Sequence, residues 1–219
     1  MAKPKLTTEI LCAEAATFAQ VESSFPEPSL YGVTDGKAVG TYLEHKFRGY
    51  LAEKYTYTAG NSASGIDFPE LEVDMKVTSV AQPQSSCPFK SARQKIFGLG
   101  YALIVFVYSK SDNPKSQTST LKIEHTIFVA KQRTADYQMT RGLRQILDNE
   151  GNEDDLVAFM MDKLLPVDEI EAHKIARELL KGAKMEQGYL TISNALQWRL
   201  QYGRVISEAG SVDGLLRVR

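Results

Sequence analysis

Hydrophobic residues recur at three- and four-residue steps in the first quarter of the chain. One such stretch covers residues 7–22, and a second runs from about Lys37 to Lys54, after a turn signal at Asp35 and Gly36. A stripe with this spacing is typical of a helix that turns one side to a core. Two prolines in residues 23–29 interrupt the pattern between the stretches. We therefore predict two helices joined by a loop.

The pattern changes to strict alternation at residues 71–77. Hydrophobic side chains alternate there with Glu72, Asp74 and Lys76. Period two sends the hydrophobic set into a core and the charged set to the opposite face of a strand. The small, polar residues 58–65 that precede it predict a flexible loop. The alternation thus predicts a strand that carries an acid and a lysine side by side.

Less regular patterns follow. Ser86, Cys87 and Pro88 indicate the start of a helix that ends near Gly98 or Gly100. The continuous apolar run at 102–108 predicts a central strand buried on both faces. A polar loop at 109–119 and a neighbouring strand at 121–130 are expected next.

The last third of the chain returns to helical spacing. We predict helices at about 134–148, 153–164, 167–182 and 193–208, with helix starts at Asp136, Ser193 and the acidic turn 153–155. We expect Trp198 to lie in the core together with Leu196, Leu200 and Tyr202. Helices, a strand-rich middle and further helices suggest one α/β domain over residues 1–219, in which a central mixed sheet is flanked by helices. Its core would span about 36–130, and a helical C-terminal part would span about 131–219.

Composition places the chain among ordinary globular proteins. Of its 219 residues, 43% are hydrophobic and 24% are charged, enough for one well-packed core. Cys12 and Cys87 match no zinc spacing and are expected to be reduced thiols. The longest apolar run is far shorter than the roughly 20 residues of a membrane helix. We expect a cytoplasmic protein that does not enter a membrane.

The net charge of −1 conceals a strong asymmetry along the chain. Residues 76–147 contain eleven Lys or Arg and three acids, a net +8, whereas residues 148–178 contain ten acids and three bases, a net −7. Such asymmetry suits a protein that presents one basic surface to a polyanion. Chance clustering on solvated faces is the alternative.

Asp67, Asp74 and Lys76 form the main candidate for chemistry. Hydrolysis of a phosphodiester needs a metal held against the phosphate, a positioned water and neutralisation of the growing negative charge. Mg²⁺ prefers carboxylate and water oxygens, and a lysine can orient the water and stabilise charge. The alternative is an exposed strand face with a Glu72, Asp74 and Lys76 charge ladder. The pattern Asp/Glu-x-Lys is by itself a weak signal for such a site, because it also occurs at Asp35 and at Glu44.

Residues 65–78 read Gly-Ile-Asp-Phe-Pro-Glu-Leu-Glu-Val-Asp-Met-Lys-Val-Thr. This segment resembles the core motif of the PD-(D/E)xK nucleases, and especially the subgroup that contains the methyl-directed mismatch-repair nicking endonuclease and some type II restriction enzymes. Asp67 and Asp74 match the spacing of the two acids, although the second acid is commonly Glu. The resemblance covers residues 36–79 and implies a restriction-endonuclease-like fold. It also implies a Mg²⁺-dependent site, in which Asp67 and Asp74 are metal ligands and Lys76 positions the water.

The same family places a helical glutamate upstream, in a Gly-x-x-x-Glu setting. Gly40 and Glu44 resemble it, which makes Glu44 a candidate catalytic acid. Glu53 is the rival, because the loop between Glu44 and Asp67 is longer than in the nicking enzyme. A solvated helix residue is the alternative reading of Glu44.

Several cationic or polar residues are candidates for contacts with DNA. They are Lys90, Arg93, Gln94, Lys95, Arg133, Arg141 and Arg144. Arginines can bind guanine edges bidentately, but most of those in DNA-binding proteins contact phosphate or solvent. Solvated helix faces are an equal alternative for residues 93–95. The three histidines match no metal or nuclease spacing, so we expect structural roles for them.

The resemblance implies a sequence-specific endonuclease that cuts double-stranded DNA, most simply a type II restriction enzyme acting as a homodimer, because a two-fold dimer presents two sites to two strands. The C-terminal part would then serve DNA recognition or dimerisation. Two alternatives stay open. One is a mismatch-repair-type nicking endonuclease with the same site, and the other is a DNA-binding protein that keeps the fold without cutting.

Overall fold

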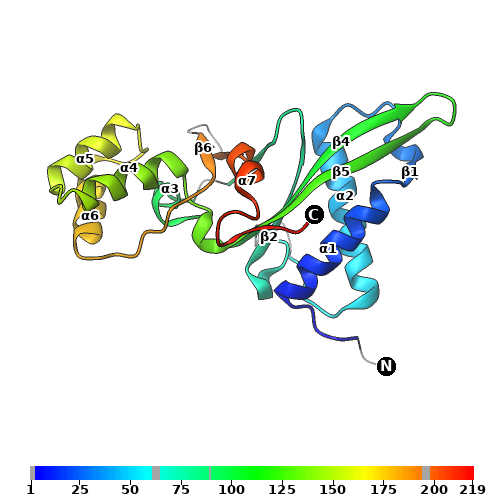
Figure 1. The fold of residues 1–219 in the computed structure, drawn as a ribbon, viewed down its shortest axis with the longest axis horizontal. Coiled ribbons are helices and arrows are strands. Elements are labelled where there is room, and N and C mark those ends of the chain that lie inside the picture. The colour runs from blue at the N-terminus through cyan, green and yellow to red at the C-terminus, as the bar shows by residue number, and fades with distance from the viewer. Residues whose placement is uncertain (1–2, 61–64, 89, 194–197) are drawn as a thin grey trace.

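A five-stranded mixed sheet lies at the centre of the computed structural model, which describes residues 3–60, 65–88, 90–193 and 198–219 (Figure 1). Its strands are β1 (Pro26–Glu27), β2 (Val73–Ser79), β4 (Ala102–Asn113), β5 (Thr118–Val129) and β8 (Leu215–Arg217). The order is β1-β5-β4-β2, with β8 also paired to β5. The β2–β4 pair is parallel and the others are antiparallel. The expected α/β class with a mixed sheet flanked by helices is confirmed.

The two N-terminal helices cover one face of this sheet. They are α1 (Thr8–Glu22) and α2 (Gly36–Lys54), close to the predicted ranges. Each begins at a side-chain cap, since Thr7 accepts from the Ile10 amide and Asp35 accepts from the Lys37 amide. Phe18, Phe47 and Phe106 meet between helices and sheet with ring centroids 5.0–6.2 Å apart. This aromatic contact fixes α2 against the sheet.

A second, three-stranded sheet covers the opposite face. Its strands are β3 (Gln84–Cys87), β7 (Trp198–Gln201) and β6 (Thr191–Ser193), in the order β3-β7-β6, and the short helix α7 (Gly203–Glu208) follows them. Trp198, Leu200 and Tyr202 are fully buried against the central strands, as expected for core residues. Leu196 lies outside the described residues.

Two predicted helices are therefore wrong. The chain at Ser86 and Cys87 is strand, and only α3 (Gln94–Phe97) is helical in the stretch that follows. Ser193 ends strand β6 instead of starting a helix, and the predicted helix at 193–208 is replaced by β7 and α7, with residues 194–197 outside the described part. Both errors have one cause: β3 and β7 pair across more than 100 residues, which a local pattern does not reveal.

The expected polar loop at 109–119 is also wrong. Strands β4 and β5 continue through it as a hairpin whose register runs to Asn113↔Thr118 (Figure 1). Its outer residues are polar because they are exposed on the projecting part of the hairpin. Polar residues there do not interrupt the backbone hydrogen-bond ladder that defines the strands.

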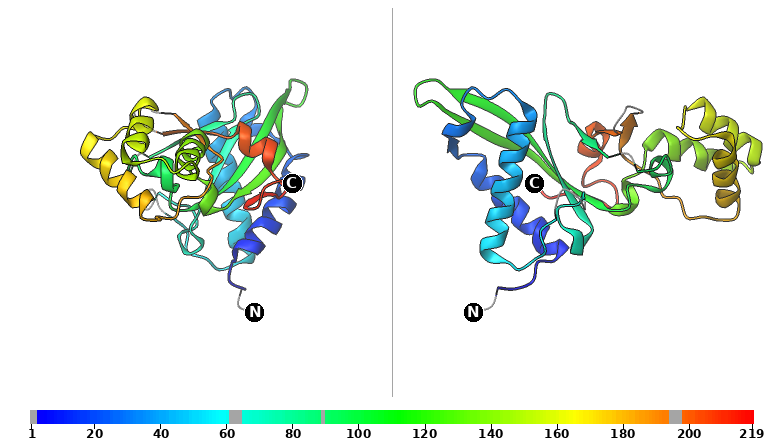
Figure 2. Two further views of the ribbon diagram at one scale, coloured as in Figure 1. Left: turned by 60° about the vertical axis from the view of Figure 1, so that its left-hand side comes forward. Right: turned by 180° about the vertical axis from the view of Figure 1, so that it is seen from behind.

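Four helices form a lobe at the end of the molecule opposite the hairpin (Figure 2). They are α3, α4 (Tyr137–Asp148), α5 (Glu153–Asp162) and α6 (Glu169–Leu180), and they have a hydrophobic core of their own. The predicted helices at 134–148, 153–164 and 167–182 are confirmed with shorter bounds. None of the helices in the described ranges is long and apolar enough to cross a membrane.

Asp136 ties this lobe to the second sheet. Its carboxylate accepts from the Met139 amide at 2.9 Å, as the predicted N-cap of α4, and also from the Ile192 amide of β6 at 2.7 Å. The side chain is only 5% exposed. Its removal would leave two buried amides without these acceptors.

We expect Asp136→Ala to lower the free energy of unfolding by roughly 2–4 kcal/mol, because each amide that loses a buried charged acceptor costs about 1–3 kcal/mol. Asp168→Ala is the matched control, since Asp168 caps α6 through one exposed contact, worth about 1 kcal/mol. Urea unfolding measures both. Equal losses in the two variants would contradict a tethering role for Asp136.

Candidate active site

A tight turn brings Asp67 beside Asp74. Pro69–Leu71 form a short 3-10 helix, and Glu72 takes a left-handed backbone with φ of 52°, so β2 begins at Val73 and not at Leu71. Phe68 and Val73 then exchange both backbone hydrogen bonds, at 2.9 and 3.2 Å. In an antiparallel bridge of this register the next pair outward is Asp67 and Asp74. The Met75 amide donates to Asp67 Oδ2 at 2.9 Å and fixes that carboxylate.

Asp74 and Lys76 lie on one face of β2, as the alternation predicts. Lys76 Nζ is 2.7 Å from Asp74 Oδ2. Val73 and Met75 point to the other face and are buried with α1 and α2. Asp74 is only 4% exposed, and Glu72 pairs with Lys131, so the alternative of a solvated ladder of three charges is wrong.

Burial makes these charges costly. The pKa of Asp74 is raised to about 6, mainly because the carboxyl is buried, while Lys76 opposes the shift and the neighbouring Asp67 adds to it. Burial alone would lower the pKa of Lys76, but the attraction of Asp74 outweighs it, and the net shift is upward. Lys76 is therefore a charged ammonium that is held by one carboxylate.

Glu44 approaches the same carboxylates from α2. Gly40, one turn earlier, lies against Val77, where an added Cβ would come within 3.9 Å of the Val77 side chain, so α2 sits close to β2. Burial, followed by the charge of Asp67, raises the pKa of Glu44 to about 7. The rival Glu53 is exposed near the end of α2, about 13 Å further along the helix. The structure brings Glu44, and not Glu53, to Asp67 and Asp74.

The sequence analysis missed Arg48. This residue lies one helical turn after Glu44, and its Nη1 is 3.7 Å from Asp67 Oδ1. Its Nη2 donates to the Gly60 carbonyl at 3.1 Å, and the Gly60 amide donates to the Asp67 carbonyl at 2.8 Å. Arg48 thus holds both ends of the segment that carries Asp67. The four-residue step from Glu44 was the available signal, because it places both side chains on one face of a helix.

The donor set fits a divalent cation bound together with substrate. Among residues the structure describes, no three His, Cys, Asp or Glu side chains are already arranged around one metal position. Mg²⁺ is commonly held by only one or two carboxylates, with phosphate and water completing its octahedron. Asp67 and Asp74 supply two. The buried Asp74 Oδ2 already contacts one cation, the Lys76 ammonium at 2.7 Å, and accepts no other hydrogen bond from the described residues.

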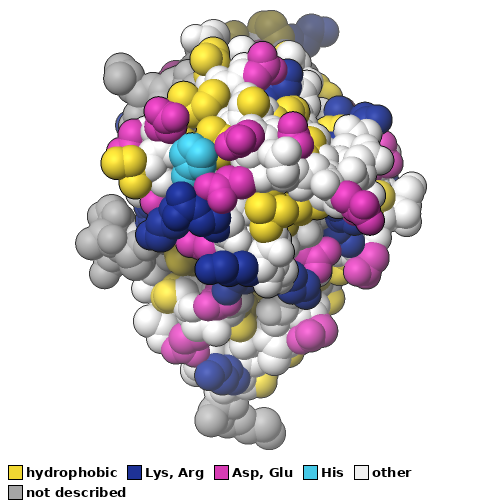
Figure 3. Space-filling model, turned by 90° about the vertical axis from the view of Figure 1, so that its left-hand side faces the viewer, with side chains coloured by type: hydrophobic (Ala, Val, Ile, Leu, Met, Phe, Trp, Pro, Cys, Tyr) yellow, Lys and Arg dark blue, Asp and Glu magenta, His cyan; other side chains and the backbone are white. Residues whose placement is uncertain are grey.

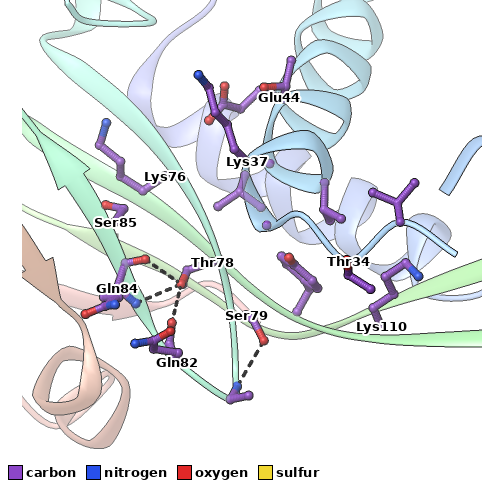
Figure 4. Close-up of a pocket in the computed structure, with 18 of the residues that line it drawn as sticks. Thr34, Lys37, Glu44, Lys76, Thr78, Ser79, Gln82, Gln84, Ser85 and Lys110 are labelled. Atoms are coloured by element: carbon purple, nitrogen blue, oxygen red, sulfur yellow. Dashed lines mark hydrogen bonds between the residues drawn. The ribbon is translucent and has the colours of Figure 1, made fainter.

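A cleft of about 1230 Å³ opens beside Lys76 and Glu44 (Figure 4). Its walls come from the first turns of α2, the end of β2, strand β3 and the base of the hairpin. Thr78 joins β2 to β3, because its hydroxyl donates to the Gln84 carbonyl and accepts from the Gln84 amide at 2.9 Å. Lys76 and Glu44 of the candidate site therefore line this open, polar channel, whereas Asp67 and Asp74 are not among its lining residues.

Several of the candidates for DNA contact take part in the packing of the lobe. Gln94 is buried and accepts from the Trp198 indole at 3.0 Å. Lys95 is 6% exposed, with its ammonium over the Trp198 ring. Arg93 forms ion pairs with Glu171 and Glu178 of α6. These contacts give residues 93–95 structural positions rather than a solvated helix face.

The other candidates differ in exposure. Arg133 donates to the Asp213 and Gln187 carbonyls and is largely enclosed. Lys90, Arg141 and Arg144 are exposed. Among the histidines, His173 pairs with Glu153 within the lobe.

Glu44 provides a test of this electrostatic arrangement without DNA. A carboxyl whose folded-state pKa is raised stabilises the fold fully below its ordinary pKa of about 4.5, and this contribution is lost as the pH rises through about 7. In metal-free buffer above pH 7, we expect Glu44→Gln to be more stable than the parent by roughly 1–3 kcal/mol, discounted for partial exposure. Urea unfolding between pH 4.5 and 8 measures the difference, with Glu53→Gln as the control. If Glu44→Gln were less stable than the parent at pH 8, the ionised Glu44 carboxylate would not be destabilised by its surroundings, and the prediction would be wrong.

Comparison with known proteins places the chain in a family. Residues 5–217 match the model of the family described as "Type II restriction enzyme NspV". A curated relative from Nostoc sp., named type II restriction enzyme NspV, is 68% identical over 213 residues, which cover 97% of this chain and 96% of the relative. No solved structure matches the chain. Because the family model and the relative both span nearly the whole sequence, the chain belongs to the NspV family of type II restriction enzymes.

Proposed function

We propose that the chain is a Mg²⁺-dependent endonuclease that cuts both strands of double-stranded DNA at a specific sequence, with Asp67, Asp74, Lys76 and Glu44 at its active site. The observation that carries this proposal is the placement of Asp67 beside Asp74, with Lys76 Nζ 2.7 Å from the buried Asp74 carboxylate. Membership of a restriction enzyme family supports it and disfavours a repair nickase or a non-cutting protein.

Asp67 and Asp74 would hold the metal. When bound, Mg²⁺ would supply the Lewis acid that polarises the phosphate and lowers the pKa of a bound water. Asp67 is oriented for this role by the Met75 amide and by Arg48. Asp74 is oriented by its place on a paired strand. Two carboxylates fixed on backbone ladders can keep their separation when substrate arrives.

Lys76 would orient the attacking water and stabilise the charge that grows on the phosphate. Its ammonium is held at Asp74, next to the two carboxylates and at the end of the cleft (Figure 4). Glu44 has a pKa near 7, so it can accept or release a proton around neutral pH. We assign Glu44 the assisting role, with the proton moving at its carboxylate.

The functional unit is proposed to be a homodimer, and the lobe α4–α6 suits contact between protein chains better than contact with DNA. Residues 148–178 carry a net charge of −7, and Figure 3 shows acidic side chains spread over this end of the molecule. Apolar side chains such as Ile170, 82% exposed, lie among them. Two free cysteines support a cytoplasmic location.

Asp74→Asn and Lys76→Ala are expected to lower the rate of plasmid cleavage by about 10³-fold or more, because the loss of a metal ligand or a charge-stabilising cation costs several kcal/mol at the transition state. Agarose gels of a mixed-sequence supercoiled plasmid measure the rate. Glu53→Gln is the control and should cut like the parent. A near-normal cleavage rate for Asp74→Asn would show that the assignment of Asp74 to the active site is wrong.

Removal of divalent metal by EDTA should abolish cleavage, and Mg²⁺ should restore it with linear DNA as the product. Asp67 and Asp74 supply oxygen ligands, which hard cations prefer. The same plasmid assay with Mg²⁺ titrated back measures the requirement. Full activity in EDTA would refute metal dependence, and a product that stays a nicked circle would favour the nicking alternative.

A further inference from the structure

Two cations face the cleft from opposite walls. Lys37 comes from the first turn of α2, and Arg199 comes from β7 in the second sheet, where it pairs with Ser86 of β3. Both side chains are exposed. Neither has a place in the resemblance that indicated Asp67, Asp74 and Lys76. They are brought together only by the packing of the second sheet beside α2 and β2.

Their charges have no acidic partner among the residues that the structure describes. In the described ranges, neither Lys37 nor Arg199 forms an ion pair, whereas the other cations that line the cleft do: Lys76 pairs with Asp74, and Lys110 pairs with Asp112. A lysine and an arginine that both point into one polar channel repel each other and attract a polyanion. The cleft therefore carries two available positive charges and is also lined by Glu44 and Lys76 of the candidate site.

The rest of the lining suits a sugar-phosphate backbone. Hydroxyl and amide groups of Thr34, Ser79, Gln82 and Ser85 line the channel (Figure 4). Such groups, with Lys and Arg, make most protein contacts to DNA phosphates. At about 1230 Å³ the cleft is larger than the roughly 300–1,000 Å³ of ordinary small-molecule pockets. Its size and polarity favour an extended chain of phosphates.

We propose that Lys37 and Arg199 bind the backbone phosphates next to the one that is cut, and so hold the strand in the cleft with its scissile phosphate at Lys76. The proposal deepens the function proposed above and rests on it. Both are positioning residues, because they lie in the channel and not at the reacting atoms. The cleft, rather than the exposed arginines of α4, is then the principal electrostatic contact with DNA.

The test is the salt dependence of DNA binding in EDTA, where the metal-dependent reaction is stopped. Binding of a fluorescein-labelled mixed-sequence duplex is followed by anisotropy for Lys37→Gln, Arg199→Gln and the double variant. Each lost phosphate contact should lower the slope of log K against log salt by about 0.9, and weaken binding near 0.1 M salt roughly five- to tenfold. With Mg²⁺, KM for plasmid cleavage should rise while kcat at saturating DNA stays unchanged.

Lys181→Gln is the control, because it removes an exposed charge just after α6 and should leave the slope unchanged. Arg144→Gln on α4 tests the rival DNA contact, and the proposal expects it to leave the slope unchanged as well. A reduced slope for Arg144→Gln with a normal slope for Lys37→Gln and Arg199→Gln would overturn the proposal, as would a fall in kcat without a change in KM. Because binding is read without cleavage, these outcomes are separate from a failure of Asp74→Asn to abolish cutting, which would count against the active site alone.

Discussion

The parallel ladder between β2 and β4 is the contact on which the candidate site depends. Strand β4 is buried on both faces from Ala102 to Tyr108, between the helices α1 and α2 and the second sheet. Strand β2 pairs with it over its whole length, from Val73↔Ala102 to Ser79↔Tyr108. This ladder holds Asp74 and Lys76 rigidly. Because β2 is the last strand in the order, its other side stays open to α2 and the cleft.

This rigidity allows charges to be kept where they are electrostatically unfavourable. Asp74 and Glu44 both have raised pKa values, for which burial is the largest cause and the neighbouring Asp67 an additional one. A metal cation would relieve this repulsion, and the buried oxygen of Asp74 is suited to receive one. The same arrangement that weakens the metal-free fold thus prepares the site for a metal and a phosphate.

Positive and negative charge are separated along the chain, in the basic segment 76–147 and the acidic segment 148–178. Some of the positive charge in segment 76–147 is engaged within the protein, because Arg93 pairs with Glu171 and Arg133 donates to the Asp213 carbonyl. Lys90, Arg141 and Arg144 of this segment stay exposed, and Lys37 and Arg199 add two exposed cations at the cleft, where α2, β2 and β7 meet. The lobe has its own core and is joined to the second sheet through Asp136.

The sequence by itself determined several local elements and which residues of the candidate site would meet. Helical spacing predicted α1 and α2, alternation predicted β2, and the order of acids and lysine predicted which residues would meet, because all these signals lie within a few residues of one another. The sequence could not show that β3 and β7 pair, that the polar residues 109–119 belong to a hairpin, or that Gln94 and Lys95 are buried. Those features depend on contacts between segments that are far apart in the chain, and the spacing of residues within one segment does not reveal such contacts. Tertiary structure alone decided that Arg48 holds Asp67, and that Lys37 and Arg199 line the same cleft as Lys76 and Glu44.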